Sequence, residues 1–168
     1  MKFVIFQTKW GWFGLAGTET AICRTFLPVK DSDLIKSCFL KEFPDAKCNK
    51  NLFKNLQNLI IAYFEGKNVD FNTDVPVFLN AFGDFSKRIL IECRNIKSGQ
   101  TITYADLAEK AGYPKAGRAV GNALAKNPIP LIIPCHRVIR ADGKLGGFSA
   151  TGGKTLKKRL LLLEKHTL

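Results

Sequence analysis

A cysteine, a histidine and an arginine are adjacent in the sequence at Cys135, His136 and Arg137, directly after a proline-rich stretch. Residues 127–134 contain three prolines, which favour a rigid, extended backbone over a helix or a central strand. A cysteine is a strong nucleophile as its thiolate, and histidine or arginine side chains nearby lower the pKa of the thiol. This pattern predicts a reactive thiol at Cys135.

A base that accepts the thiol proton, and an acid that orients this base, would complete such a site. Neighbours on an extended chain point to opposite sides, so His136 serves Cys135 only if the backbone turns or a water bridges the two side chains. Glu164 is the candidate acid, because Asp142 precedes Gly143 and is typical of a turn. An ordinary interpretation stays open for each residue: a buried structural thiol, a satisfied polar histidine and a solvated glutamate.

The chain is strongly basic, with 26 Lys and Arg against 14 Asp and Glu, a formal net charge of +12 and a pI of about 9.7. Such an excess favours binding to a polyanion, either nucleic acid or an anionic membrane surface. No apolar stretch reaches the length of a spanning helix, and the N-terminus is unlike a signal peptide. We therefore expect a cytoplasmic protein.

The five cysteines are odd in number and irregular in spacing, which indicates thiols in a reducing compartment. Whether Cys38 and Cys48 form a disulfide is left open by the sequence. There is no Cys-x-x-Cys, and the histidines are His136 and His166 alone. We therefore expect no metal site.

The first 75 residues show strand patterns followed by helix patterns. Aromatic and β-branched runs predict three strands, at residues 3–7, 11–15 and 21–27, with Pro28 ending the third. Apolar periodicity predicts two helices, at residues 31–43 and 51–65. The polar segment 67–76 indicates a linker, which divides the chain into an N-terminal α/β domain, residues 1–75, and a C-terminal domain, residues 76–168.

The C-terminal part has helix patterns throughout. A long amphipathic helix is expected at residues 77–97, with an apolar stripe of Phe78, Phe82, Phe85, Ile89 and Cys93. Thr103 is a natural N-cap for a short helix to residue 111, and Pro114 is placed to open another helix to residue 126. Two short helices joined by a glycine-containing turn outline a helix-turn-helix. A closing helix is expected at residues 154–165.

The second short helix is made almost entirely of small residues, with Arg118 as the large exception. Small residues allow a helix to approach its neighbour closely. They fit two interpretations equally well: tight packing on another helix, or entry into a DNA groove with Arg118 projecting into it.

At these residues the chain resembles the O6-alkylguanine-DNA alkyltransferases, also called methylated-DNA–protein-cysteine methyltransferases. The family's signature pentapeptide stands in the sequence as Pro134-Cys135-His136-Arg137-Val138. Further matches run from Gly99 to Glu164, and a weaker likeness covers residues 10–15 and 63–66. The resemblance thus covers most of the chain.

The resemblance implies an α+β fold, in which a small N-terminal α/β domain of the ribonuclease-H-like type packs on a mostly helical C-terminal domain with a winged helix-turn-helix. It implies that Cys135 takes an alkyl group from O6 of a guanine flipped out of duplex DNA, once per molecule and without a cofactor. The implied partner is double-stranded DNA that contains O6-alkylguanine, bound by a monomer without sequence specificity.

The resemblance also implies roles for individual residues. His136 would accept the thiol proton through a water held with Glu164, Asn127 would brace the turn, and Tyr104 would hydrogen-bond the guanine. Arg118 would fill the place that the flipped base leaves. The residues implied in DNA binding are Thr103, Tyr104, Arg118, Ala119 and Gly121. Those implied in the base pocket are Pro130, Val138, Phe148 and Ser149.

Two features depart from the family pattern, since Phe148 stands where many relatives have tyrosine and the segment 150–154 is slightly long. Two other classes of protein remain as alternatives. A lesion-binding module of the same architecture would lack the signature cysteine. A cysteine hydrolase using Cys135, His136 and Glu164 would leave Arg118 and the basic charge unexplained.

Overall fold

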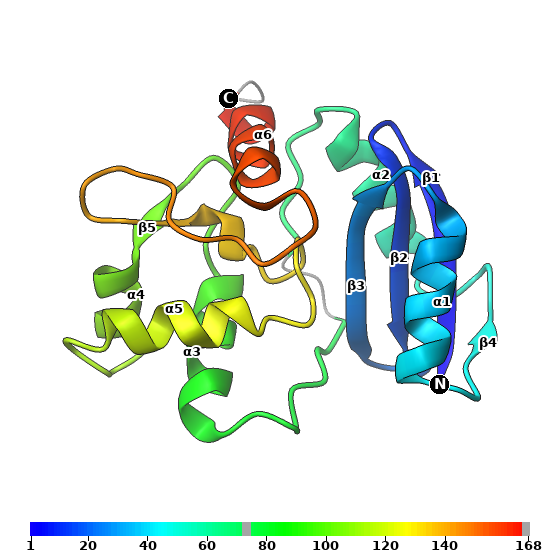
Figure 1. The fold of residues 1–168 in the computed structure, drawn as a ribbon, viewed down its shortest axis with the longest axis horizontal. Coiled ribbons are helices and arrows are strands. Elements are labelled where there is room, and N and C mark those ends of the chain that lie inside the picture. The colour runs from blue at the N-terminus through cyan, green and yellow to red at the C-terminus, as the bar shows by residue number, and fades with distance from the viewer. Residues whose placement is uncertain (72–74, 166–168) are drawn as a thin grey trace.

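The computed structural model describes residues 1–71 and 75–165, and its fold is α+β (Figure 1). We call residues 1–71 the N-terminal half and residues 75–165 the C-terminal half. The N-terminal half is a small sheet with two helices, and the C-terminal half is mostly helical. The expected fold class is confirmed at this level.

The N-terminal sheet has four strands in the order β3-β2-β1-β4. Its strands are β1 (Lys2–Thr8), β2 (Gly11–Gly17), β3 (Ile22–Val29) and β4 (Lys47–Cys48). The first three are antiparallel neighbours, and β4 runs parallel to β1. The third strand ends two residues later than expected, at Val29 rather than at residue 27, because β3 lies at the sheet edge, where a residue without an N–H such as Pro28 is tolerated. The two-residue β4 is exposed and carries no pattern that predicts it.

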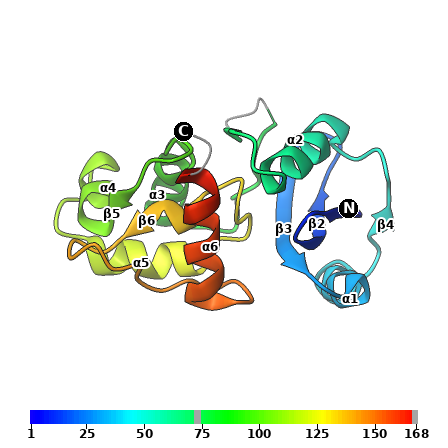
Figure 2. The ribbon, with the colours of Figure 1, turned by 90° about the horizontal axis from the view of Figure 1, so that it is seen from above.

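Two helices cover opposite faces of this sheet, α1 (Ser32–Glu42) and α2 (Lys54–Phe64), as Figure 2 shows. Both were expected from the apolar periodicity. Alternate residues of β1 serve the two faces, since Phe3 packs with Ile35 and Phe39 of α1, whereas Val4 belongs to the larger cluster on the other side. Helix α1 lies very close to the sheet, because a Cβ on Gly14 would come 2.4 Å from the Ile35 side chain.

The C-terminal half holds four α-helices among its described residues. They are α3 (Asp84–Arg94), α4 (Tyr104–Lys110), α5 (Gly117–Ala125) and α6 (Gly153–Lys165). A single 3-10 turn, η1 (Cys135–Arg137), precedes the short strand β6 (Val138–Ile139), which pairs in parallel with β5 (Ile102–Thr103). No helix in the described parts of the chain is long and apolar enough to cross a membrane.

The first C-terminal helix is shorter than expected, since α3 begins at Asp84 rather than at residue 77. The preceding segment instead lies along the free edge of β3, where Ile22 N–H donates to the Pro76 carbonyl (2.8 Å) and Phe78 N–H donates to the Ile22 carbonyl (2.7 Å). Pairing with the sheet satisfies these backbone groups and leaves Phe78 47% exposed. Its expected place on the buried stripe is therefore wrong.

Two further boundaries differ from the expectation. Helix α5 begins at Gly117 and not at Pro114, because Lys115 has a left-handed backbone (φ 68°) that a helix does not accept. The expected linker at 67–76 is wrong in part, because Val69 and Phe71 are buried in the core. Residues 72–74 of that segment lie outside the described residues.

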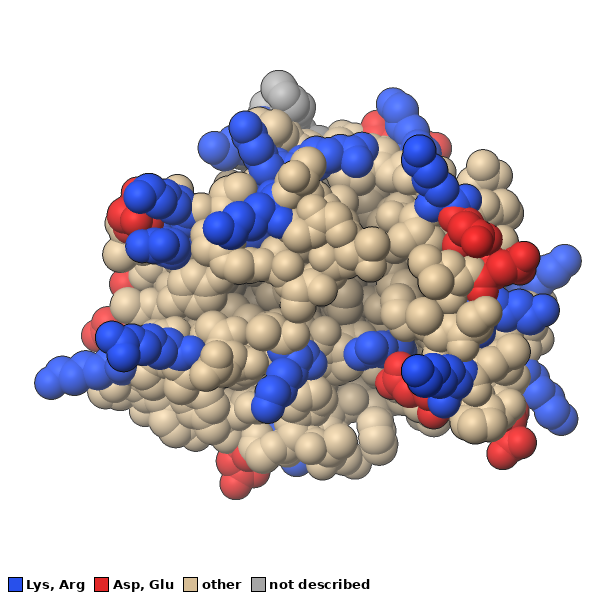
Figure 3. Space-filling view, viewed as in Figure 1, with Lys and Arg blue, Asp and Glu red and all other residues tan. Residues whose placement is uncertain are grey.

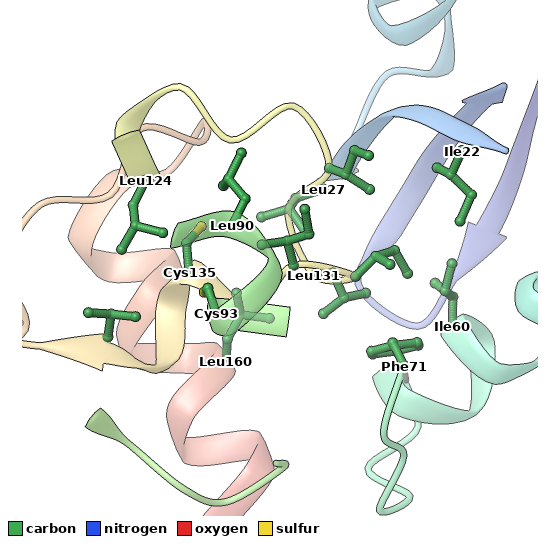
Figure 4. Packing of buried hydrophobic residues seen from close by; sticks show 14 of the residues in the cluster. Ile22, Leu27, Ile60, Phe71, Leu90, Cys93, Leu124, Leu131, Cys135 and Leu160 are labelled. Atoms are coloured by element: carbon green, nitrogen blue, oxygen red, sulfur yellow. The ribbon is translucent and has the colours of Figure 1, made fainter. Parts of the chain in front are cut away.

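The two halves share one hydrophobic cluster, which Figure 4 shows from close by. Ile22, Leu27 and Ile60 from the N-terminal half meet Leu90 and Leu131 from the C-terminal half within it. Polar contacts also join the halves. The Thr25 hydroxyl donates to the Pro130 carbonyl (2.7 Å), and the Arg159 guanidinium lies 4.2 Å from the centre of the Trp10 ring.

Candidate active site

The backbone turns sharply at the expected nucleophile. Cys135 is the first residue of η1, where Arg137 N–H donates to the Pro134 carbonyl (2.9 Å). The extended path expected for residues 127–134 therefore ends in a turn, which is the condition under which His136 can serve Cys135. The Cys135 side chain is buried, with 8% of the residue exposed. All five cysteines carry free thiols, so Cys38 and Cys48 are not bonded to each other.

Asn127 braces this turn through three hydrogen bonds. Its Nδ2 donates to the Ile133 carbonyl (2.8 Å) and to Cys135 Sγ (3.2 Å), while its Oδ1 accepts from Ile129 N–H (3.0 Å). Burial raises the pKa of the Cys135 thiol, and the Asn127 hydrogen bond and the Lys157 charge oppose this rise. The net shift is upward, so the resting group is a thiol and the site needs a base to release its proton.

His136 and Glu164 form a buried pair, with 2.7 Å between His136 Nε2 and Glu164 Oε1. Burial lowers the pKa of His136, although the carboxylate opposes this, so the imidazole is neutral near pH 7. A neutral ring bonded to a carboxylate carries its proton on Nε2. Its Nδ1 is then a lone-pair acceptor, and it has no hydrogen-bond partner within residues 1–71 and 75–165. The free nitrogen is the one that can take a proton.

Glu164 is held by further donors that the sequence did not point to. Arg137 donates from Nε to Oε2 (3.1 Å) and from Nη2 to Oε1 (3.0 Å), and the Tyr63 hydroxyl donates to Oε1 (2.8 Å). Burial raises the pKa of Glu164, but the hydrogen bonds and charges of His136 and Arg137 outweigh it and lower the pKa to about 2. Glu164 is thus ionised near pH 7. The position of Arg137 in the signature was the only available signal for it.

Lys157 is a second residue that sequence reasoning missed. It is fully buried, and its Nζ donates to the carbonyls of Val138 (2.6 Å) and Gly147 (3.3 Å). Burial lowers the pKa of this lysine to about 8, against the effect of the nearby thiols. Its spacing to Leu160 and Glu164 places the three residues on one helical face, and this periodicity was the signal available in the sequence.

A cavity of about 600 Å³ opens at Cys135, between α5 and the loop that follows β6. Four of the expected contact residues line it together with the cysteine: Tyr104, Gly121, Phe148 and Ser149. The loop approaches Tyr104 so closely that a Cβ on Gly146 would lie 2.7 Å from the tyrosine hydroxyl, and Gly146 also has a positive φ of 71°. Only glycine fits this position without rearrangement.

Two expected base-pocket residues lie elsewhere. Pro130 lines a neighbouring groove of about 460 Å³ that also reaches Cys135, and Val138 is fully buried with its carbonyl held by Lys157. Phe148 and Ser149 line both cavities, so the expected pocket wall is shared between them. The cysteine lies at the junction of the two.

Helices α4 and α5 present the residues expected to contact DNA. The Thr103 hydroxyl caps α4 by accepting from Asp106 N–H (3.1 Å), as expected from its type and position. Arg118 and Ala119 are exposed on α5, whereas the side of α5 that includes Val120 is buried. The structure therefore supports tight packing for one face of α5 and leaves the Arg118 face open to a partner.

Basic side chains also lie on the C-terminal half, as they do on the N-terminal half. Figure 3 shows lysines and arginines over the C-terminal half, above and below the uncharged, hollowed centre of this face. Arg140, Lys144, Lys154 and Lys158 line a third cavity of about 440 Å³. Arg140 and Lys154 also line the cavity that holds Cys135.

Comparison with known families agrees with this arrangement. Residues 84–166 match the family model described as the 6-O-methylguanine DNA methyltransferase DNA-binding domain. A buried thiol at a cavity beside the exposed Arg118 face of α5, within a match to a DNA-binding domain, defines the class: proteins that use a cysteine for group transfer on DNA.

Curated relatives extend the match to almost the whole chain. A methylated-DNA–protein-cysteine methyltransferase of Metallosphaera sedula is 42% identical over 135 residues, which are 80% of this chain and 82% of that protein. The protein of the same name from Methanosarcina barkeri is 37% identical over 169 residues, covering 100% of this chain and 99% of its own. This chain belongs to the methylated-DNA–protein-cysteine methyltransferase family.

Solved structures support the same assignment. Mycobacterium tuberculosis OGT in complex with DNA is similar with a TM-score of 0.82 and 30% identity, over 99% of this chain and 94% of that one. The O6-methylguanine-DNA methyltransferase of Pyrococcus kodakaraensis has a TM-score of 0.73 at 23% identity, over 96% of this chain and 98% of its own. The likeness to the Pyrococcus kodakaraensis protein shows that the two chains share a fold.

Proposed function

We propose that this chain repairs DNA by moving an alkyl group from O6 of a guanine to Cys135, once per molecule and without a cofactor. The observation that carries this proposal is the Cys135 thiol at the cavity, with Asn127 on its sulfur and the His136–Glu164 pair beside it. The names of the relatives, which describe methylated DNA as donor and a protein cysteine as acceptor, support the same reaction.

The proposed reaction uses these residues in sequence. The thiol proton passes through a water to Nδ1 of His136, while Glu164 holds Nε2 and stabilises the imidazolium that forms. The sulfur then forms a bond to the alkyl carbon, and the bond from this carbon to O6 breaks with its electron pair going to the guanine. Burial raises the pKa of Tyr104, so its hydroxyl stays protonated and donates a hydrogen bond to the departing base.

The proposed partner is double-stranded DNA containing O6-alkylguanine, bound by charge and shape without sequence specificity. The alkyl carbon is out of reach inside a stacked duplex, so the nucleotide must flip into the cavity. In this proposal Arg118 fills the vacated place, and Thr103, Ala119 and Gly121 contact the backbone around it. The support for Arg118, Ala119 and Gly121 is the exposure of α5 beside the cavity, and Thr103 lies at the N-cap of the neighbouring α4.

The finer description of the fold is also part of the proposal. A ribonuclease-H-like N-terminal domain, residues 1–75, is supported by three antiparallel strands followed by a helix and a parallel strand. A winged helix-turn-helix in residues 76–168 is supported by α4, α5 and the glycine-rich loop after β6. A monomeric, cytoplasmic protein completes the proposal, on the sequence reasoning given above.

The test is the mass of the intact protein after incubation with duplex DNA that carries one O6-methylguanine. We expect one added methylene, mapped to the peptide with Cys135 and missing in the Cys135→Ser variant. Tight binding without a mass change would instead make the chain a lesion-binding module. Turnover on esters or amides at Cys135 would make it a hydrolase.

A further inference from the structure

The loop after β6 and the first turns of α6 form a strongly basic cleft. Arg140 and Lys144 come from the loop, and Lys154 and Lys158 come from α6. All four residues are exposed, and they surround the cavity of about 440 Å³. On the face shown in Figure 3, basic side chains gather where Figure 1 places this loop and helix.

The positive charge of the cleft is only partly neutralised. Asp142 lies at its outer side, where it pairs with Arg140 (3.1 Å) and Lys144 (3.6 Å). Lys154 and Lys158 form no ion pair with the residues that the structure describes. They lie four residues apart on α6, where like charges are neighbours and destabilise a helix. The N-terminus of the same helix adds a partial positive charge.

The cleft is continuous with the cavity at Cys135. Arg140, Gly146 and Lys154 line both spaces, so the two cavities meet at these residues. The loop that separates them is a compact turn, in which Gly143 N–H donates to the Arg140 carbonyl (3.0 Å) and Arg140 N–H donates to the Lys144 carbonyl (2.9 Å). These two hydrogen bonds fix the shape of the loop that lines the cleft.

We propose that this cleft binds the phosphodiester groups next to the flipped nucleotide, on the strand that carries the lesion. Lys154 and Lys158 bind the phosphates as point charges, and Arg140 adds a planar donor at the entrance. The duplex is then held from two sides, by α5 in the groove and by this cleft on the extruded strand. The inference rests on the proposed function and adds a second DNA contact to it.

Salt dependence of binding tests the cleft directly. In a Cys135→Ser background, the affinity for a fluorescent duplex with one O6-methylguanine is measured between 50 and 200 mM salt. Because each neutralised phosphate contributes about 0.9 to the slope of log affinity against log salt, the Lys154→Gln/Lys158→Gln variant should lower that slope by about 1.8. The matched control is Lys36→Gln/Lys41→Gln, which removes two exposed lysines from α1. An unchanged slope, or an equal fall in the control, would overturn the proposal.

DNA in which one phosphate is replaced by an uncharged methylphosphonate shows which strand the cleft contacts. A methylphosphonate beside the lesion should weaken binding by the Cys135→Ser protein and have little further effect on the variant that also lacks Lys154 and Lys158. The same change in the complementary strand should weaken both proteins equally. Equal effects from both strands would overturn the strand assignment.

Methyl transfer from the free base O6-methylguanine tests the proposed function independently of the cleft. O6-methylguanine alone has no phosphate, so the Lys158→Gln variant with Cys135 retained should accept its methyl group at the unmodified rate, because Lys158 lines the cleft and not the cavity at Cys135. If no form of the protein is methylated by free base or duplex, the proposed function fails. If methylation is normal and the salt slope is unchanged, only the cleft proposal fails.

Discussion

His136 and Glu164 are in hydrogen-bond contact at 2.7 Å although 28 residues separate them in the chain. The contact forms because η1 and α6 pack together, and the Arg137 guanidinium fixes the other side of the carboxylate. One turn of backbone thus carries Cys135, the proposed base His136 and the Arg137 cation that holds the Glu164 carboxylate. Four expected outcomes follow from this arrangement and from α5.

Replacing Glu164 with Gln should slow alkyl transfer by a factor of about 100, within the range that a positioned acid–base group supplies. The amide can still contact His136 but cannot stabilise an imidazolium. DNA affinity should change little, because Glu164 is buried away from the surface. Single-turnover transfer measured by intact mass, beside DNA binding by anisotropy, checks both parts. An unchanged transfer rate would remove Glu164 from the relay.

Replacing Arg118 with Ala should weaken action on duplex DNA more than action on the free modified base. The side chain is exposed on α5 and makes no contact with the cavity floor, so its loss affects nucleotide flipping and not the thiol chemistry. Transfer rates from both substrates, measured side by side, give the comparison. Equal losses on the two substrates would contradict a role for Arg118 in the groove.

Replacing Tyr63 with Phe should destabilise the protein by about 1.5 kcal/mol, the lower value for a hydrogen bond to a charged group. The lost hydroxyl joins the two halves through Glu164. Urea unfolding measures the change. Tyr113→Phe is the matched control, since this tyrosine is 36% exposed and should tolerate the loss of its hydroxyl. Equal losses of unfolding free energy in the two variants would show that the hydrogen bond from Tyr63 to Glu164 adds no stability.

Acid should destabilise the fold in two steps. Burial lowers the pKa of His136 below 6.5, so below this pH the unfolded chain binds a proton that the folded state resists, and stability falls. Glu164 has its pKa lowered from 4.5 to about 2, so its contribution is complete above pH 4.5 and is lost as the pH falls towards 2. Between pH 4.5 and pH 3 the unfolding free energy should fall less steeply in Glu164→Gln, because this variant lacks the carboxylate that titrates there. An identical pH profile for that variant would contradict the second step.

The sequence predicted much of the site because local signals coincide with it. Pro134 and His136 flank the nucleophile, and Thr103 has the type and place of an N-cap. It did not predict the fully buried Lys157, because a lysine next to Lys158 and Arg159 is typical of a solvated face and only the spacing to Glu164 indicates otherwise. It also misplaced Phe78, since pairing between residues 76–78 and the edge of β3 is a long-range contact that no local pattern records.

The hydroxyl of Tyr63 reaches the Glu164 carboxylate from the other half of the chain, and both halves contribute to one apolar cluster. Residues 75–165 are therefore not a portable module. A truncated protein without the N-terminal sheet would expose Leu131 and its neighbours to water and leave Glu164 without one of its hydrogen-bond donors. A chimera that joins these residues to a foreign N-terminal segment should be active only if that segment covers the apolar surface. It must also place a tyrosine hydroxyl within hydrogen-bond distance of Glu164.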